Sequence, residues 1–253
     1  MEVSFKRIAK IYTDFPSKFG LPRQSGMSDA LKGTIVFEPE YRRAEAFRGL
    51  EGFSHIWVLW EFSEAKRDVW SPTVRPPRLG GNARMGVFAT RSPFRPNPIG
   101  LSCLKLEAVE QVASLGVVLH VSGIDMMDQT PIYDIKPYLP YTDAHPEAEA
   151  GWTAAADKRL LDVHFPEELL ERLPLEKREG AIAFLSHDPR PAYSSSDKIY
   201  KVVYAGYDIA FSVFPDASLI VSDVAKIKCA TAACLICLRL EDHRLLPIHN
   251  VNS

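Results

Sequence analysis

The chain is 253 residues long, carries a formal net charge of -2, and is 46% hydrophobic and 25% charged. These values are ordinary for a globular protein, and the balanced charge means that any nucleic-acid binding must use a local patch. No apolar run approaches the length that spans a bilayer, and the amino terminus lacks the apolar core of a signal peptide, so we expect a cytoplasmic protein.

Short segments rich in β-branched and aromatic residues predict strands throughout the first 145 residues. These strands are expected at 3–12, 34–37, 53–62, 85–89, 101–109, 117–122 and 131–136. The run 53–62 is almost wholly apolar, which predicts a strand covered on both faces. One helix is expected at 40–48, ending near Gly49. Many short strands with few helices predict a barrel or a sandwich.

After residue 144 the composition changes, and 145–151 has the composition of a linker or an exposed loop. The stretch 166–187 then predicts two helices, the second opened by Pro174. Further strands are expected at 199–214, 219–224 and 234–240. We therefore expect a mainly β chain, with a β-rich domain at 1–145 and a smaller α+β domain at 146–253.

Cysteine usage gives little support for a metal site. The four cysteines are Cys103, Cys229, Cys234 and Cys237. A zinc site would need the last three and a fourth ligand such as His243. The segment 234–240, however, has the pattern of an apolar strand, in which positions three apart point to opposite faces. We expect buried free thiols and no metal.

The segment 91–102 holds three prolines and a glycine, which predicts a rigid, shaped loop. Residues 71–100 include five arginines and no Asp, Glu or Lys. Arginines on stiff backbone suit recognition of phosphate, carboxylate or a guanine edge, and a solvated loop-rich surface is the alternative.

Several catalytic motifs are absent. The glycine spacing at 81–86 resembles a phosphate-binding loop, but the Lys and Ser/Thr that should follow are missing. No G-x-G-x-x-G opens a helix, and neither G-x-S-x-G nor H-E-x-x-H occurs. His55 lies inside an apolar strand, where a core histidine is expected more often than a base.

The proline loop and six further segments resemble the TrmO (TsaA-like) family of S-adenosylmethionine-dependent tRNA methyltransferases. These segments are 19–24, 48–55, 74–82, 86–90, 128–141 and 188–193. The resemblance implies a small β-barrel that binds the methyl donor, followed by a smaller α+β domain, in a homodimer. It also implies methylation of the N(6) nitrogen of threonylcarbamoyl-adenosine, next to the anticodon of a threonine tRNA.

Carried over by position, the resemblance implies a set of residues that contact S-adenosylmethionine. They are Pro22, Arg23, Gln24, Phe62, Ser63, Arg91, Leu101, Ser122, Gly123, Ile124 and Asp125. Phe62 and Leu101 are expected to sandwich the adenine, and an arginine is expected to hold the carboxylate of the donor. The sequence departs from the family at Ser63, where a histidine is expected, and at Gln129, where a glycine is usual and allows a tight turn.

The acceptor nitrogen carries a carbonyl substituent, so its attack benefits from removal of a proton. The candidate bases are Asp125, Asp128 and Asp134, with His55 and Tyr138 behind them. A structural role in a turn is the alternative for each aspartate, and water is the alternative proton acceptor.

A tRNA would be bound through a surface of mostly basic residues. The expected contacts are Arg75, Arg78, Arg84, Arg95, Arg190, Tyr193 and Lys198. Three other functions stay open: a methyltransferase with the same barrel that acts on another RNA or a metabolite, a non-catalytic module that binds the donor or RNA, and a scaffold for an acidic protein.

Overall fold

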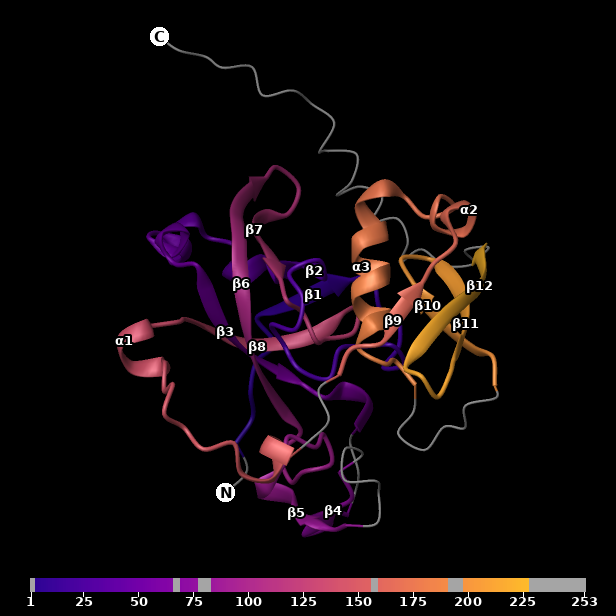
Figure 1. The fold of residues 1–253 in the computed structure, drawn as a ribbon. Coiled ribbons are helices and arrows are strands. Elements are labelled where there is room, and N and C mark those ends of the chain that lie inside the picture. The colour runs from indigo at the N-terminus through magenta and orange to yellow at the C-terminus, as the bar shows by residue number, and fades with distance from the viewer. Residues whose placement is uncertain (1–2, 66–68, 77–82, 156–158, 191–197, 228–253) are drawn as a thin grey trace.

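The structure, a computed structural model, describes residues 3–65, 69–76, 83–155, 159–190 and 198–227. Its first part is a closed antiparallel barrel in the order β1-β2-β7-β6-β3-β8 (Figure 1). The barrel strands are β1 (Ala9–Thr13), β2 (Lys32–Phe37), β3 (His55–Glu61), β6 (Ile99–Val112), β7 (Gly116–Ser122) and β8 (Thr130–Pro137). The expectation of a mainly β chain is confirmed, and pairing of β8 with β1 decides for a barrel.

Strand β3 buries only one of its faces, so the expectation of a strand covered on both faces is wrong. Ile56, Val58 and Trp60 point into the barrel and are buried, and the residues between them are partly exposed. The outward Trp57 instead packs beside Tyr138, with the ring centroids 5.8 Å apart. An apolar run therefore reflects an aromatic contact on the outside of the barrel as well as its core.

The helix expected at 40–48 is wrong in type. The chain forms separate 3-10 helices at Pro39–Tyr41 and Ala44–Phe47, and Gly49 then turns the chain with a φ of 88°. These tight turns bring Phe47 onto Phe37 of β2, with the ring centroids 4.7 Å apart. Burial of that aromatic pair decides the local conformation over the helical preference of the sequence.

The second part is a four-stranded sheet in the order β10-β11-β12-β9, with two helices. Its elements are β9 (Asp162–His164), α2 (Glu167–Leu170), α3 (Leu175–Ser186), β10 (Tyr200–Tyr204), β11 (Tyr207–Val213) and β12 (Ser218–Lys226). The two expected helices are confirmed, and Pro174 precedes α3. The single strand expected at 199–214 is a hairpin, because Ala205 and Gly206 both have positive φ. The strand expected at 234–240 lies outside the described residues, as do Cys229, Cys234 and Cys237.

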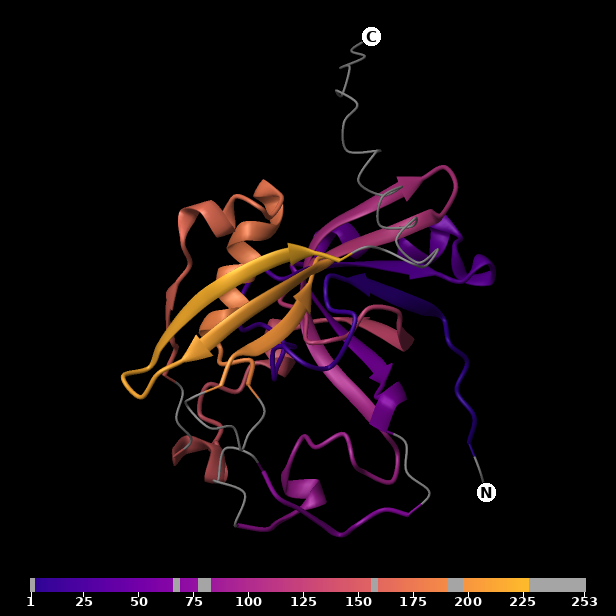
Figure 2. The same cartoon turned by 90° about the vertical axis from the view of Figure 1, so that its right-hand side faces the viewer.

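Two short strands, β4 (Thr73–Val74) and β5 (Met85–Gly86), pair outside the barrel. Figures 1 and 2 both place them at one end of the molecule. The strand expected at 85–89 ends at Gly86 and continues as a 3-10 turn. The helix α1 (Pro140–Asp143) follows the last barrel strand. Within the described ranges, no helix combines the length and apolar character required to cross a membrane.

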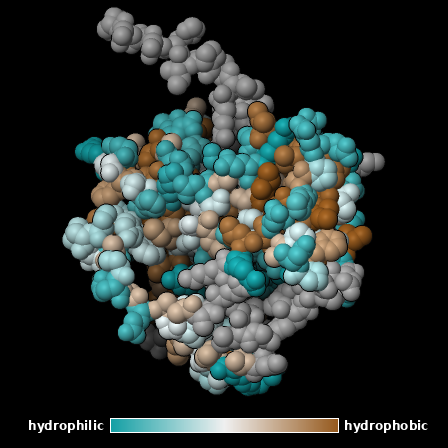
Figure 3. Space-filling view, viewed as in Figure 1, coloured by the Kyte–Doolittle hydropathy of each residue, from teal (hydrophilic) through white to brown (hydrophobic). Residues whose placement is uncertain are grey.

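The barrel and the second part share one hydrophobic core. Phe15 after β1, Phe184 of α3 and Tyr204 of β10 form a triangle of rings with centroids 5.0 to 5.5 Å apart. Next to it, Nζ of Lys177 lies 2.9 Å from both carboxylate oxygens of Asp14, and the N–H of Ala205 donates to the Asp14 carbonyl. The second part thereby fixes the start of the loop 14–31. Figure 3 shows further apolar surface over this part of the molecule.

The turn before β8 contains Gln129 with a φ of 60°, at the position where the family that the sequence resembles usually has a glycine. We predict that Gln129→Gly raises the free energy of unfolding by about 0.5 kcal/mol, because relief of the left-handed strain exceeds the added entropy of the unfolded chain. Gln129→Val should instead lower it, because a β-branched residue tolerates this conformation least. Chemical denaturation of both variants measures the change in the free energy of unfolding. A Gly variant less stable than the wild type would contradict the prediction.

Candidate functional site

The candidate site lies at one end of the barrel. Antiparallel pairing places the loop 14–31, the residues after β3 and the turn after β7 at this end, because Thr13 pairs with Gly33 and Lys32 pairs with Ser122. The opposite end holds the start of β1 and the hairpin between β6 and β7. Three segments far apart in the sequence thus meet around one opening.

Backbone hydrogen bonds join the loop 14–31 to the turn after β7. The N–H of Gly26 donates to the carbonyl of Gly123 at 2.8 Å, and the N–H of Gly123 donates to the carbonyl of Leu31 at 2.9 Å. Gly123 has a φ of 73°, and a Cβ there would lie 3.1 Å from the backbone of Gly26. Close backbone approach therefore requires glycine at this position.

Asp125 follows this turn and is held by several donors. The Ser102 hydroxyl donates to its carboxylate at 2.6 Å, and the indole N–H of Trp60 donates to the Ser102 oxygen at 2.9 Å. Burial raises the pKa of Asp125 to about 6, against the opposing effects of Ser102, the backbone N–H groups of Asp125 and Ser25, and the positive charge of Arg91. The carboxyl group of Asp125 therefore loses its proton at a higher pH than an ordinary aspartate does.

Trp60 can reach Ser102 because Gly100 leaves space for its ring. A Cβ on Gly100 would overlap the indole of Trp60, so the indole lies directly against the β6 backbone. The ring of Phe62 also packs against this indole, with its centroid 4.3 Å from that of Trp60. Strand β6 is thus adapted to the hydrogen-bond chain that ends on Asp125.

Beside Asp125, the segment 91–102 contacts the loop 14–31. Nη1 of Arg91 donates to Oε1 of Gln24 at 2.6 Å, and Nε2 of Gln24 donates to the Arg23 carbonyl at 2.5 Å. Arg91 is exposed, and its partner Gln24 is neutral. A guanidinium bound to a neutral amide keeps its charge available for an anionic ligand.

The structure brings most of the expected donor residues to this opening. Gln24, Arg91, Gly123 and Asp125 are directly connected there through the contacts above, and the Ile124 N–H donates to Leu31 at 3.4 Å. The remaining positions are Pro22 and Ser122, which are buried, and Arg23 and Ser63, which are exposed. Ser122 donates to Glu107 at 2.6 Å.

Phe62 and Leu101 lie on different sides of the barrel wall, and the adenine sandwich expected of them stays a prediction. Phe62 packs against Trp60 on the inner side, whereas Leu101 is exposed on β6 between the buried Gly100 and Ser102. Successive residues of a strand point to opposite faces, so the Leu101 side chain points away from Ser102. Any contact of Leu101 with a ligand beside Ser102 would use its backbone.

The other candidate bases have separate roles. Asp128 accepts the Thr13 N–H at 3.1 Å and thereby supports the turn after β1. Asp134 is ion-paired to Lys136 at 2.9 Å, and it lines a cleft with Ile135 and Pro137 toward the opposite end of the barrel.

The histidine and the tyrosine lie together, also away from Asp125. His55 is half-buried, pairs with the Ser54 hydroxyl at 2.9 Å and lies 6.1 Å from the Tyr138 ring, so it is not a core histidine. His55 begins β3, whereas the opening is at the end of that strand.

The basic residues expected to bind tRNA divide into two groups. Arg75, Arg84 and Lys198 are exposed. Arg95 donates to the Thr90 carbonyl of its own loop at 3.0 Å, and Arg190 forms a two-pronged ion pair with Asp188 at 2.7 and 2.8 Å. These two arginines stabilise their own loops. Arg78 and Tyr193 lie outside the described residues.

Sequence reasoning missed Trp60, Ser102 and Ser25. The sequence did contain one indication for Ser102. In the alternating pattern of its strand, Ser102 falls on the same buried face as Leu104. A hydroxyl at such a position needs a partner. Nothing in the sequence indicated that the partners would be Trp60 and Asp125, since they come from other strands.

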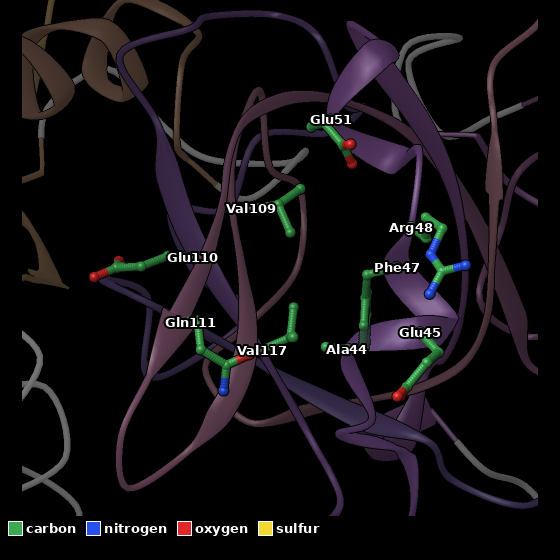
Figure 4. A pocket seen from close by; sticks show the side chains of 9 residues that line it. All are labelled: Ala44, Glu45, Phe47, Arg48, Glu51, Val109, Glu110, Gln111 and Val117. Carbon is green, nitrogen blue, oxygen red and sulfur yellow. The ribbon is translucent and has the colours of Figure 1, made fainter. Parts of the chain in front are cut away.

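A separate cleft of about 350 Å³ lies at the opposite end of the barrel (Figure 4). Phe47 and Val117 face one another across it, and Glu45 and Glu51 lie at its edge. Neither Asp125 nor Arg91 lines this cleft. Its lining carries the carboxylates of Glu45, Glu51 and Glu110 and one arginine, Arg48.

Comparison with known proteins agrees with this geometry. Residues 10–144 match the family model for the tRNA-methyltransferase O N-terminal domain. The tRNA (adenine(37)-N6)-methyltransferase of Escherichia coli K12 is 42% identical over 218 residues, which cover 83% of this chain and 92% of that protein. A putative S-adenosylmethionine-dependent methyltransferase of Pseudomonas aeruginosa is 41% identical over 204 residues, covering 78% and 86%.

Solved structures give the same result. The crystal structure of TrmO from P. aeruginosa superimposes with a TM-score of 0.72 at 34% sequence identity, covering 89% of this chain and 98% of that one. The similarity includes both the barrel and the second part, because it extends well beyond residue 144. The chain belongs to the tRNA-methyltransferase O family.

Proposed function

We propose that this protein transfers a methyl group from S-adenosylmethionine to the N(6) nitrogen of adenine 37 in tRNA, acting on the threonylcarbamoyl-modified base. The observation that carries the proposal is the partly buried Asp125, held by Ser102 beside the exposed Arg91 at the mouth of the barrel. The relatives named for the same reaction, or for use of the same donor, support it.

The residues at the opening fit the chemistry of the donor. The guanidinium of Arg91 suits its carboxylate, and the Phe62 ring offers apolar surface for its adenine. The backbone N–H groups near Ser122 and Gly123 suit the polar edge of that adenine. When bound, S-adenosylmethionine supplies a methyl group on a sulfonium, a leaving group that needs no activation by acid.

We assign Asp125 the role of proton acceptor. The N(6) lone pair is delocalised into the neighbouring carbonyl, so attack is assisted when a base takes the N–H proton. A carboxylate with a pKa of about 6 is ionised at neutral pH and is more basic than an ordinary aspartate. Ser102 and Trp60 orient the carboxylate by fixing one of its oxygens.

Three finer statements belong to the same proposal. The substrate is a threonine tRNA, the active form is a homodimer, and the reaction takes place in the cytoplasm. We place the domain boundary at 145/146, and this is supported by the interval between β8, which ends at Pro137, and β9, which begins at Asp162.

The decisive experiment incubates the purified protein with isotope-labelled S-adenosylmethionine and tRNA made with or without the threonylcarbamoyl group. We expect label in the modified nucleoside at position 37, and only when the threonylcarbamoyl group is present. Label in another nucleoside would identify a different acceptor. Donor binding by calorimetry without transfer to any tRNA would identify a non-catalytic module.

The role of Asp125 predicts a specific pH dependence. Activity of the wild type should rise with pH through about 6, as the Asp125 carboxyl loses its proton. Ser102→Ala removes a hydrogen bond that stabilises the charged form, so the pKa rises further and the rise in activity moves to higher pH. Single-turnover rates from pH 5 to 9 measure this shift.

The matched control is Thr34→Val, which removes another buried hydroxyl of the barrel, bonded to His120 at 3.2 Å. It should leave the pH profile in place. Asp125→Asn should lower the single-turnover rate and remove its rise with pH near 6. If Asp125→Asn retained the wild-type rate, Asp125 would not be the base.

The Arg91–Gln24 contact predicts a loss of donor affinity. Arg91→Ala should raise the Kd for S-adenosylmethionine by about ten- to a hundred-fold, because a charged hydrogen bond to the carboxylate is lost. Calorimetry measures it, with Arg7→Ala as control, because Arg7 is ion-paired to Glu38 at the opposite end of the barrel. An equal rise in Kd in the two variants would show that Arg91 does not bind the donor.

A further inference from the structure

Two aromatic side chains are exposed on the segment that precedes the proline loop. Phe88 is 73% exposed and Trp70 is 49% exposed. Their ring centroids lie 6.3 Å apart with an interplanar angle of 35°. Aromatic side chains this close usually form part of a core, so an exposed pair indicates a surface that meets a partner.

The local fold holds this pair in place. Pairing of Thr73 with Gly86 joins β4 to β5, and the N–H of Val87 donates to the Pro72 carbonyl at 2.9 Å. Val87 is buried and anchors the turn, so the following Phe88 is directed outward. From another segment, the Trp152 indole N–H donates to the Ala89 carbonyl at 2.8 Å. Backbone hydrogen bonds thus fix the segments that carry Trp70 and Phe88.

The charge around the pair is positive. The sequence from residue 69 to residue 100 contains no Asp, Glu or Lys. Arg75 and Arg84 are exposed, and Nη1 of Arg84 donates to the Thr73 hydroxyl at 3.4 Å, which places it on the same small sheet. A stacking surface combined with arginines, on a segment without carboxylates, complements an unpaired nucleic-acid strand, whose bases stack while its phosphates carry the negative charge.

We propose that Trp70 and Phe88 form a stacking platform for unpaired bases of the substrate's anticodon loop, with Arg75 and Arg84 at the adjacent phosphates. This inference rests on the proposed function and adds to it the way in which the loop is held. Phe88 precedes Arg91 by three residues, so the platform and the donor site share one segment. Bases flanking the reacting adenosine are therefore held as that adenosine turns toward Asp125.

The experiment measures equilibrium binding of an unmodified anticodon stem-loop RNA to the full chain over a range of salt concentrations. Trp70→Ala and Phe88→Ala should each weaken binding about five-fold or more, by a factor that is similar at low and high salt, because stacking releases no counterions. Arg84→Ala should weaken binding mainly at low salt and reduce the salt slope by about one.

Conservative variants and a matched control separate stacking from folding. Trp70→Phe and Phe88→Tyr keep an aromatic face and should bind within about two-fold of the wild type. The control is Tyr141→Ala on α1, an aromatic residue that is 86% exposed, and it should leave affinity unchanged.

Two outcomes would overturn the proposal. One is unchanged RNA affinity in the Trp70→Ala, Phe88→Ala double variant. The other is a change in its sedimentation from dimer to monomer, which would make the pair a contact between two copies of the chain. Failure of the wild type to methylate tRNA would instead reject the proposed function. The binding measurement would still show whether Trp70 and Phe88 contribute to RNA affinity.

Discussion

The removal of the Asp125 carboxylate from water is the constraint on which the arrangement of the site depends. A partly buried carboxylate is unfavourable unless donors surround it. Ser102 lies on strand β6, Ser25 lies in the loop 14–31, and Arg91 begins the proline loop that leads into β6. Because each donor must arrive at a defined position, strand β6, the loop 14–31 and the proline loop are fixed relative to one another. Gly100 and Ser102 both point into the barrel from β6, where Gly100 leaves space for the Trp60 ring and Ser102 donates to Asp125.

The second part of the molecule contributes to this site without touching Asp125. Its ring triangle around Phe15 and the ion pair between Lys177 and Asp14 fix the start of the loop 14–31. Both side chains of this ion pair are mostly shielded from solvent, so the pair fixes the position of the loop better than a fully exposed pair would. A loop anchored in this way presents Gln24 and Ser25 with little further loss of entropy when a ligand binds. The second part is therefore a support for the loop 14–31 as well as a surface of its own.

The two ends of the barrel carry different sets of side chains. One end carries Asp125, Arg91 and the small β4–β5 sheet with its aromatic pair. The opposite end carries the cleft edged by Glu45 and Glu51. The same cleft is lined by Glu110 and Arg48 as well, so the two ends carry different sets of charges although the net charge of the chain is close to zero.

The sequence by itself determined the strands of the barrel, the two helices of the second part and the basic proline loop. These features follow from neighbours along the chain, through alternation of apolar residues and the restrictions that proline and glycine impose. The helix expected at 40–48 failed because burial of Phe47 against Phe37 outweighs local preference. Only the tertiary structure decided which expected residues meet. It connects Asp125 to Ser102 and Trp60, places Asp134 toward the other end of the barrel and occupies Arg190 with Asp188, because contacts between distant strands depend on register and closure, which local pattern does not encode.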